Sequence, residues 1–349
     1  MNDHFRQGRA AEHTDTPLQI VIHSPFPEYL SRELEKRYQN VFCTLTRVPE
    51  DLLEGEVSAY IAFNGAEPVT IILYQRKARR ITVFNEYLAL PSEEVERMAR
   101  HLFAEHRTAD VISLSSVVPD NGRGSFPAQR CNASEDIVIS LPGCVESYFS
   151  ALGPNTRAAV RKSQKAVAAR RPAIAFTFYE KGDVGLERIA QMIELSCRRL
   201  TSKQQVPRHD DRSVGLLRKM VDSYGITLVA EMEGQVVGGV ICTQVGSHFY
   251  MHVVTHDGRF DELRLGMLCC YLSIAEAIRR GAREYHLLSG KYDYKFRFLG
   301  VQRDYDRIVI YRSLGRLLSN ISLFTAIEIR RSGRCAKQQL ISWRKKWKR

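Results

Sequence analysis

The sequence lacks the segments that mark exported and membrane-embedded proteins. It contains no run of 18 or more apolar residues, so we expect no membrane-spanning helix. Residues 1–16 are polar, mixed in charge and without an apolar core segment, which predicts a disordered lead-in and not a signal peptide. Together these absences favour a cytoplasmic protein.

The common motifs for metals, nucleotides and disulfides are also missing. The ten histidines form neither HxH nor HExxH, so we expect no metal. GxGxxG and GxxxxGK[ST] are absent, which disfavours a dinucleotide-binding or P-loop enzyme. The eight cysteines contain no CxxC pair, so we expect reduced thiols. Cys269 and Cys270 lie in an apolar helical run and are predicted to be buried, with a reactive Cys269 as the alternative.

Positive charge is present and is concentrated at the C-terminal end. The net charge is +12, and residues 330–349 hold nine Lys or Arg and no acidic residue. This asymmetry indicates an anionic partner, such as a membrane, nucleic acid or an acidic polymer. We predict a basic helical tail over 316–349, in which Leu340, Trp343 and Trp347 share one side and contact the inner membrane peripherally. A disordered basic tail is the alternative.

The rest of the chain shows one pattern of elements twice. In each half, three strands joined by short turns are followed by a helix and then by another strand. The first set is predicted at 57–63, 68–75, 80–85, 91–106 and 110–117, and the second at 226–233, 236–244, 247–255, 265–281 and 283–290. This predicts an α+β protein with two units in tandem, at 17–125 and 136–315, although β-β-β-α-β is also common in unrelated α+β proteins.

Other segments connect and flank these units. Residues 118–135 are rich in Gly, Pro, Asn and Ser and are predicted to form the crossover between the units. A basic helix is expected over about 145–170. A helix over 314–327 is expected to pack its apolar face on the body of the protein.

Three segments of the second unit carry a resemblance to a known family. They are YFSALGPNTRAAVRKSQKAV (148–167), the helix that begins near Gly266, and SGKYDYKFRF (289–298), in which a glycine and a short gap precede Tyr-Lys. They resemble the acetyltransferase domain of CelD-like proteins, a branch of the GNAT superfamily named from cellulose and exopolysaccharide clusters. They are also similar to Fem-type transferases, which carry two GNAT-like units in tandem. The resemblance covers roughly residues 140–315.

This resemblance implies a GNAT-like mixed sheet flanked by helices. It implies direct attack of an amine on the thioester of acetyl-CoA or another acyl-CoA. The acceptor amine would belong to a sugar or to a cell-envelope or exopolysaccharide precursor. Two alternatives remain open. One is a Fem-type enzyme that uses aminoacyl-tRNA, the one role for nucleic acid that we expect, and the other is a non-catalytic adaptor at the membrane.

The start of the second long helix is the expected cofactor site. In the GNAT arrangement the pyrophosphate binds there, since unpaired amides and the helix dipole favour an anion. The amides of Met267 and Leu268 would donate, Gly266 would let the backbone approach the phosphate, and Arg264 or Arg259 would add charge. The usual Gln/Arg-x-x-Gly-x-Gly/Ala signature is reduced here to a remnant around the glycine.

Acyl transfer to an amine needs a base with a pKa near neutral and an acid with a higher pKa. The resemblance places Tyr294 beside the thiol and predicts it as the acid, with a hydrogen-bonded core tyrosine as the alternative. His252 is the main candidate base because it lies in the middle of a predicted strand, although a core histidine has the same pattern. Glu231 and His286 are further candidates for the base.

Several basic residues are candidates for binding the acceptor. Lys295 would bind a substrate carboxylate or phosphate, unless it is an ordinary surface lysine. Arg157, Arg161 and Lys165 are spaced i, i+4 and i+8, so they share one helix face. This face would clamp an anionic acceptor or a nucleotide-linked sugar, or it would simply be a solvated helix surface.

Overall fold

A single mixed sheet of 13 strands organises the protein. The computed structural model describes residues 18–27, 29–48, 57–118, 120, 122, 124–202 and 211–329. The strands follow the order β1-β2-β3-β4-β6-β13-β7-β12-β11-β10-β9-β8, and β5 pairs with β6 beside this path. The predicted lead-in and the predicted membrane contact of Leu340, Trp343 and Trp347 lie outside the described residues.

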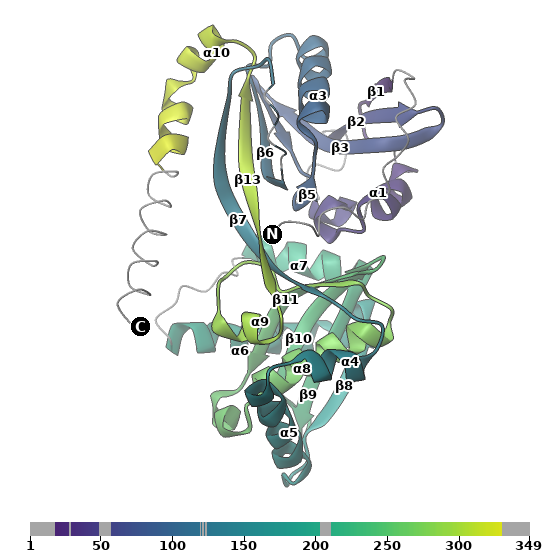
Figure 1. The fold of residues 1–349 in the computed structure, drawn as a ribbon, viewed down its shortest axis with the longest axis vertical. Coiled ribbons are helices and arrows are strands. Elements are labelled where there is room, and N and C mark those ends of the chain that lie inside the picture. The colour runs from purple at the N-terminus through teal and green to yellow at the C-terminus, as the bar shows by residue number, and fades with distance from the viewer. Residues whose placement is uncertain are drawn as a thin grey trace.

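The first unit forms the upper half of the molecule (Figure 1). Its strands are β1 (Gln19–His23), β2 (Val57–Asn64), β3 (Glu67–Lys77), β4 (Arg80–Val83), β5 (Leu88–Ala89) and β6 (Val111–Val118). Its helices are α1 (Leu30–Tyr38), the short 3₁₀ turns η1 (Val41–Cys43) and η2 (Leu45–Arg47), and α3 (Ser92–Glu105). The apolar side of α3, which includes Met98, Leu102 and Phe103, is buried on the sheet, as the helical spacing predicts.

The second unit forms the lower half (Figure 1). Its strands are β8 (Ala175–Glu180), β9 (Gly225–Met232), β10 (Gln235–Val245), β11 (His248–His256) and β12 (Glu284–His286). Its helices and 3₁₀ turns are α4 (Val145–Ala151), α5 (Pro154–Ala168), η3 (Lys181–Val184), α6 (Leu186–Ser202), α7 (Asp211–Tyr224), η4 (Gly258–Leu263), α8 (Leu265–Arg279) and α9 (Asp293–Arg297).

The predicted repetition of the two units is confirmed by the strand pairings. In the first unit β2, β3 and β4 form an antiparallel meander, α3 follows, and β6 returns parallel to β4. In the second unit β9, β10 and β11 form the meander, α8 follows, and β12 returns parallel to β11. The chain therefore contains the predicted α+β architecture with two similar units in tandem.

Two long strands, β7 (Ala128–Ser140) and β13 (Val301–Tyr311), join the units into one sheet (Figure 1). β13 pairs with β6 of the first unit and with β7, and β7 pairs with β12 of the second unit. The predicted crossover over 118–135 therefore contains the first part of β7, which begins at Ala128. The middle of β7 is polar and only partly buried, so its sequence does not alternate as a half-buried strand should.

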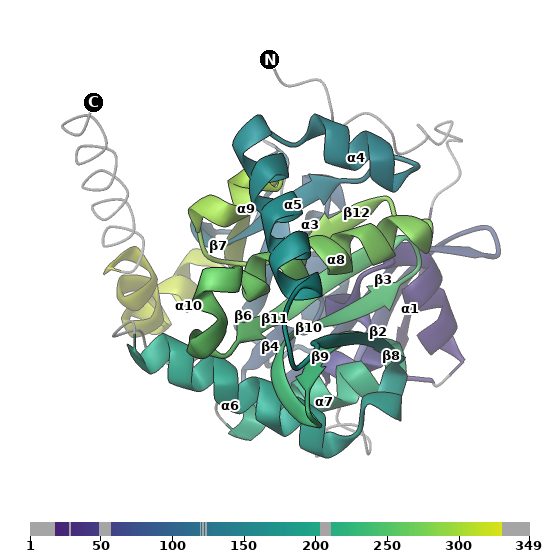
Figure 2. The ribbon, with the colours of Figure 1, turned by 90° about the horizontal axis from the view of Figure 1, so that it is seen from below.

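In the second unit, helices cover both faces of the sheet (Figure 2). One apolar cluster joins α4, α5 and α8 to β9, β10 and β11, through residues such as Val160, Leu268 and Met251. On the other face, a second cluster joins α6, α7 and η1 to the same strands, through residues such as Met192 and Tyr250. Side chains of β11 therefore reach either layer according to their position along the strand.

Two predicted elements are shorter than expected. The helix over 145–170 is divided into α4 and α5, because Leu152 and Gly153 are extended and Pro154 begins a new helix. The strand over 283–290 is reduced to β12, and the chain after it has a positive φ at Leu288 and Gly290. Both breaks matter for the site described below.

The helix predicted over 314–327 packs on the body only in part. Helix α10 (Leu314–Ser319) ends before Asn320, and residues 321–329 form a further helical segment. Leu317, Phe324 and Ile327 pack against Val111 and Tyr311, as predicted. In contrast, Leu314, Leu318, Ile321 and Ile329 are exposed. Within the described part of the chain, none of the helices is long and apolar enough to cross a bilayer.

Candidate active site

Strands β11 and β12 part in the middle of the second unit. Their parallel pairing joins His248 to Glu284, Phe249 to Tyr285 and Tyr250 to His286, and then ends. β11 continues for six more residues to His256, whereas the amide of Leu287 turns away to the carbonyl of Ile137 on β7. The two strands are thus separated beyond Tyr250.

Lys295 stabilises this separation. Its ammonium nitrogen donates to the carbonyl oxygens of Leu287, Leu288 and Ser289 at 2.7 to 2.8 Å, and its side chain is buried. These carbonyls belong to the chain that leaves the sheet, so the ammonium supplies donors that a neighbouring strand would otherwise provide. The expected role of Lys295 in binding a substrate anion is therefore not supported, because the three N–H groups already have acceptors.

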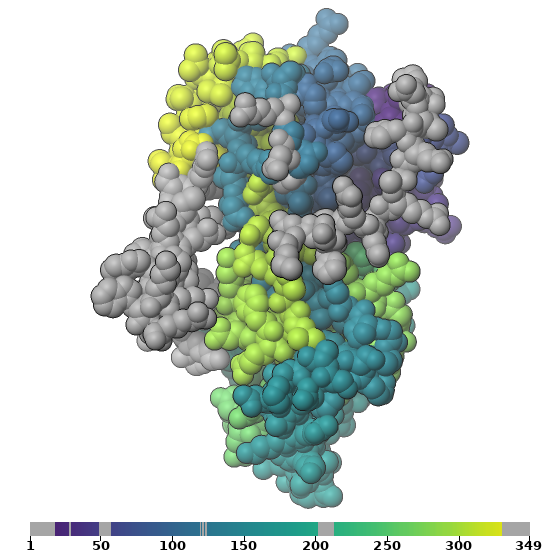
Figure 3. All heavy atoms as spheres, in the orientation of Figure 1, coloured from purple at the N-terminus to yellow at the C-terminus, as the bar shows by residue number. Residues whose placement is uncertain are grey.

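A cavity of about 370 Å³ lies at the start of α8. It is lined by Asn155, Thr156, Ala159, Arg264, Met267, Tyr294, Arg297 and Phe298. These residues come from the starts of α5 and α8 and from α9 and its end. The surface around it is formed by the teal α4–α5 segment and the yellow-green segment that contains α9 (Figure 3). Among the described residues that line the cavity, two carry guanidinium groups and none carries a carboxylate.

The start of α8 differs in detail from the expected anion site. Arg264 precedes the helix with a left-handed backbone, and its carbonyl accepts from the amides of Met267 and Leu268. These two amides are therefore not the free donors that the sequence suggested. They take the first intrahelical bonds, and the earlier amides of Leu265 and Gly266 have no acceptor one turn back within the helix.

Gly266 is needed for a reason other than the predicted one. A Cβ atom at this position would lie 2.4 Å from Nδ1 of His256. The imidazole of His256 therefore rests against the backbone of the helix start, and only glycine leaves room for it.

The contacts of His256 identify further residues at this end of β11 that the sequence analysis missed. Its Nε2 lies 2.6 Å from Oδ1 of Asp261, and its Nδ1 lies 3.4 Å from a guanidinium nitrogen of Arg199 on α6. No motif links α6 to the end of β11 in the sequence, because their proximity depends on how α6 packs on the sheet.

Arg259 is held away from the expected role of binding phosphate. Its guanidinium makes two bonds of 2.7 and 2.9 Å with Oδ2 of Asp257, and its backbone amide donates to Oδ1 of the same residue. These hydrogen bonds lower the pKa of Asp257 and raise that of Arg259. Asp257 thus neutralises Arg259 locally, and Arg264 is the predicted cation that lines the cavity.

The environment of Tyr294 suits a proton donor. The side chain lines the cavity and packs against the apolar layer formed by α5 and α8. Burial, together with the nearby Cys270, raises the pKa of its phenol, and the charge of Arg199 acts in the opposite direction. A phenol with a raised pKa is protonated at neutral pH, so its O–H is available as a donor.

The three candidates for the base are in different environments. His252 lies on β11 just beyond the last pair with β12, is partly buried, and its Nε2 is 2.9 Å from Thr243 Oγ1. Glu231 lies on β9, two strands from the parting, and forms a 2.8 Å ion pair with Arg188. Glu231 is therefore not placed for the role that was expected. His286 is buried in a polar cluster on β12 that is described below.

Cys269 is buried, as its position in an apolar helical run predicted. Its side chain is fully inside the apolar layer around α8, and burial raises the pKa of its thiol to about 12. A thiol with this pKa is protonated at neutral pH and is a poor nucleophile.

The basic helix contributes to the cavity with residues other than those predicted. Arg157 donates to the carbonyls of Ser150 and Leu152 at the end of α4, and Arg161 lies over the ring of Phe149, 5.2 Å from its centre. Both arginines thus help to fix α4 against α5. Lys165 is exposed. Asn155 and Thr156, which the sequence analysis did not single out, line the cavity instead.

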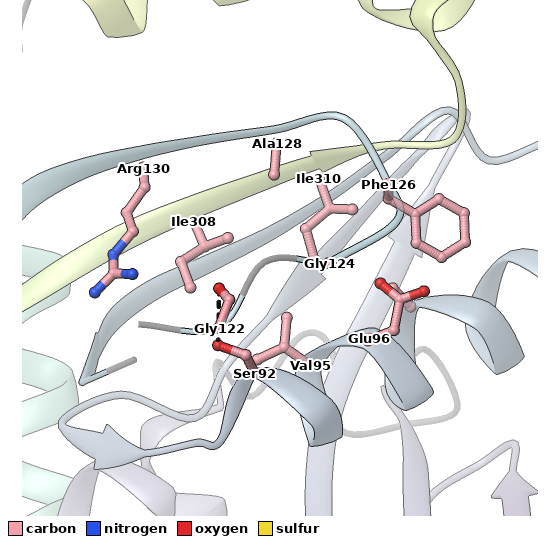
Figure 4. Close-up of a pocket in the computed structure, with 11 residues that line it drawn as sticks. Ser92, Val95, Glu96, Gly122, Gly124, Phe126, Ala128, Arg130, Ile308 and Ile310 are labelled. Atoms are coloured by element: carbon pink, nitrogen blue, oxygen red, sulfur yellow. Dashed lines mark hydrogen bonds between the residues drawn. The ribbon is translucent and has the colours of Figure 1, made fainter. Parts of the chain in front are cut away.

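The equivalent position in the first unit is the start of α3. The carboxylate of Asp120 accepts from the backbone amide of Ser92 at 3.1 Å and from its hydroxyl. Glu93 and Glu94 follow in the first turn. A cavity of about 110 Å³ lies alongside, between α3 and strands β7 and β13, and is lined in part by Ile308, Ile310 and Phe126 (Figure 4).

A comparison with known families matches a part of the chain that includes most of the residues lining the cavity at the start of α8. Residues 154–296, which are less than half of the chain, match the model of the acetyltransferase (GNAT) domain. No curated protein sequence matches the chain significantly.

Solved structures resemble the whole fold at low sequence identity. FemX is 10% identical, with a TM-score of 0.60, over 82% of this chain and 96% of FemX. L-PGS from Bacillus licheniformis is 14% identical, with a TM-score of 0.51, over 87% of this chain and 97% of that one. A third is the C-terminal domain of a protein from Agrobacterium fabrum assigned as a lysylphosphatidylglycerol synthetase. It is 10% identical, with a TM-score of 0.50, over 84% of this chain and 94% of that chain.

These findings bear on the fold and on the class of chemistry. The solved structures show that the two-unit fold is shared, and the family model identifies a GNAT acetyltransferase domain in the second unit. Together they support an acyltransferase.

Proposed function

We propose that the second unit transfers an acyl group, most simply acetyl, from an acyl-CoA to an amine. The observation that carries this proposal is the parting of β11 from β12 beside the start of α8. In a GNAT-like sheet the pantetheine arm of CoA lies between two such strands. The cavity at the start of α8 is proposed to hold the part of the cofactor that leads to its phosphates.

The charges around the cavity favour an anionic ligand. Arg264 and Arg297 line it, and α8 begins there with no acidic residue in its first turn. The helix dipole and the early amides of α8 add positive potential at the same place. We assign this end of the cavity to the pyrophosphate of CoA.

The proposed reaction uses one group from each face of the sheet. His252 lies 6.1 Å, ring to ring, from Phe42 in the layer with α6 and α7, whereas Tyr294 packs on the layer with α5 and α8. The amine nitrogen attacks the thioester carbon, and His252 accepts the proton that the amine loses. As the carbon–sulfur bond breaks, the phenol of Tyr294 gives its proton to the departing thiolate.

The acceptor is proposed to be an amine of a sugar or of a cell-envelope or exopolysaccharide precursor, as in the CelD-like branch. Arg161, Lys162 and Lys165 form an exposed basic surface on α5, close to the residues of that helix that line the cavity. This surface suits an acceptor that carries phosphate, such as a nucleotide-linked sugar.

A peripheral membrane contact would bring the enzyme to such an acceptor. Leu314, Leu318, Ile321 and Ile329 expose apolar surface on the segment that leads into residues 330–349, where nine basic residues and both tryptophans stand. Apolar and basic side chains together favour the surface of an anionic bilayer. The likeness to a protein assigned as a lysylphosphatidylglycerol synthetase is in keeping with this proposal.

The likeness to FemX favours a second candidate, a Fem-type enzyme that takes its acyl group from aminoacyl-tRNA. Here the basic surface of α5 would contact the tRNA backbone. A non-catalytic adaptor remains the third candidate, since the CoA signature is reduced to a remnant.

Thermal unfolding with CoA, acetyl-CoA and tRNA separates these candidates. CoA at 100 times its dissociation constant should raise the free energy of unfolding by about 2.7 kcal/mol. We expect this stabilisation with CoA and acetyl-CoA and none with tRNA. Stabilisation by aminoacyl-tRNA alone would favour the Fem-type reaction, and no response to any of these ligands would favour the adaptor.

A further inference from the structure

Three potential metal ligands meet where β11 and β12 pair. The parallel register places His248 directly opposite Glu284, and His286 follows two residues later on the same face of β12. One ligand atom from each of these side chains lies within 4.8 Å of the others. The ring of Tyr250, on β11, stacks on the ring of His286, with 4.3 Å between the ring centres.

His286 is held as a metal-binding histidine usually is. Its Nδ1 lies 2.6 Å from Oδ2 of Asp136 on β7, and this carboxylate is completely buried. Its Nε2 is also buried, lies 3.3 Å from Oε2 of Glu284, and makes no hydrogen bond of acceptable geometry. The exposed fraction of His286 is only 4%. A carboxylate that fixes one nitrogen while the other points at further ligands is the common outer-shell arrangement around metals.

We propose that His248, Glu284 and His286 bind one divalent transition-metal ion of the zinc type, with Asp136 orienting His286. Two imidazoles and one carboxylate are ligands that suit Zn²⁺ and Co²⁺ and are less suited to Mg²⁺ or Ca²⁺. A tetrahedral Zn²⁺ ion would take one further ligand, which water can supply. The site does not depend on the proposed acyl transfer, in which none of these side chains takes part.

The charges near the cluster are compatible with a cation. Asp136 and Glu284 carry two negative charges, and Arg303 compensates one by binding both oxygens of Glu284 at 2.6 and 2.8 Å.

The absence of HxH and HExxH predicted no metal, but these motifs detect only ligands that lie close together in the sequence. Glu284 and His286 are two residues apart, but His248 precedes them by more than thirty residues. Only the pairing of β11 with β12 brings the three together. A site assembled by strand register in this way has no local motif.

Metal binding by the full, tag-free chain tests the proposal directly. Protein dialysed against a chelator and then titrated with Co²⁺ should bind one equivalent and gain the visible absorption of a protein-bound ion, which Zn²⁺ should abolish. Because His248 is only partly buried, His248→Gln should fold and lose this absorption. Asp136→Asn should weaken binding by about 10- to 100-fold, as the loss of an outer-shell partner does.

A matched control is His101→Gln, which removes a partly buried histidine of α3 in the first unit. This variant should bind Co²⁺ like the wild type. The proposal is overturned if the wild-type chain takes up no stoichiometric metal, or if His248→Gln and Glu284→Gln both fold and bind Co²⁺ as the wild type does. CoA-induced stabilisation measured on the same samples reports on the proposed acyl transfer separately.

Discussion

The two units share one order of strands and helices but differ at the position where a CoA-type cofactor would lie. In the first unit, β5 occupies the space after β4. Leu88 and Ala89 pair with β6, and the amide of Tyr87 donates to the carbonyl of Ser116 at 2.7 Å. In the second unit, no strand of the described chain follows β11 in this way, and β11 and β12 are unpaired beyond Tyr250 and His286. The same architecture is therefore closed in one unit and open in the other.

The starts of α3 and α8 also differ, in the charge of the side chains that lie beside them. At α3 the carboxylate of Asp120 binds the amide of Ser92 and takes the place that a phosphate would need. At α8 the cavity is lined by Arg264 and Arg297. Because an anion at a helix start competes with any other anion there, the first unit is a poor site for pyrophosphate and the second a favourable one. A GNAT-like fold alone does not indicate which unit would bind the cofactor, whereas the groups at the ends of its helices and strands favour the second unit.

The largest expected effect concerns the proposed acid of the open unit. Tyr294→Phe removes the proposed proton donor but keeps the ring that packs against the α5 and α8 layer. Loss of a general acid should reduce kcat by about 10²- to 10⁴-fold, whereas the affinity for CoA should change little. Steady-state kinetics and calorimetry with CoA measure the two quantities.

Tyr292→Phe is a matched control for this variant, since Tyr292 is exposed and lies outside the cavity lining. Its turnover should stay close to that of the wild type. If Tyr294→Phe turned over at the wild-type rate, Tyr294 would not be the acid. The difference between the two units would then no longer include a catalytic tyrosine.

The sequence predicted the architecture better than the site, for physical reasons. Long elements with clear periodicity, such as α3 and α8, were placed within one or two residues. The repeated order of strands followed from short turns between apolar runs. By contrast, β7 lacks alternation because its polar middle is only partly buried, so its first part was not predicted as a strand.

The errors in the site share one cause, which is that a side chain's partner is decided by packing. Lys295 was expected to face a substrate but instead binds three carbonyls of the preceding turn. Arg259 is paired with Asp257, and Arg157 with the end of α4. Each is a long cation whose nearest acceptor lies within the protein, which the sequence alone does not show.

A second variant would make the open unit resemble the closed one. Met267→Asp places a carboxylate in the cavity at the first turn of α8, where α3 carries Glu93 and Glu94. Loss of favourable potential and added repulsion, each worth roughly 1 kcal/mol, should weaken CoA binding by about tenfold or more. Calorimetry with CoA measures this change.

Met267→Leu is the control, because it keeps the apolar volume and adds no charge. It should bind CoA nearly as the wild type does. Equal affinity of Met267→Asp and Met267→Leu would indicate that the phosphates of CoA do not lie at the start of α8.

The smallest expected effect concerns the closed unit. Asp120→Asn removes the charge that caps α3, while the amide side chain keeps its size. Because Asp120 is exposed, its loss should reduce the free energy of unfolding by only about 0.5–1 kcal/mol and leave turnover unchanged.

The hydrogen bonds from Ser92 and Gly122 lower the pKa of Asp120 in the folded protein. Its contribution is therefore complete above the unfolded pKa of about 3.9 and is lost as the pH falls through the lower, folded value. Urea unfolding of the wild type and Asp120→Asn should accordingly differ at pH 7 and converge under acidic conditions. A pH-independent difference would mean that the charge of Asp120 does not stabilise the start of α3, and an effect on turnover would mean that the first unit takes part in the reaction.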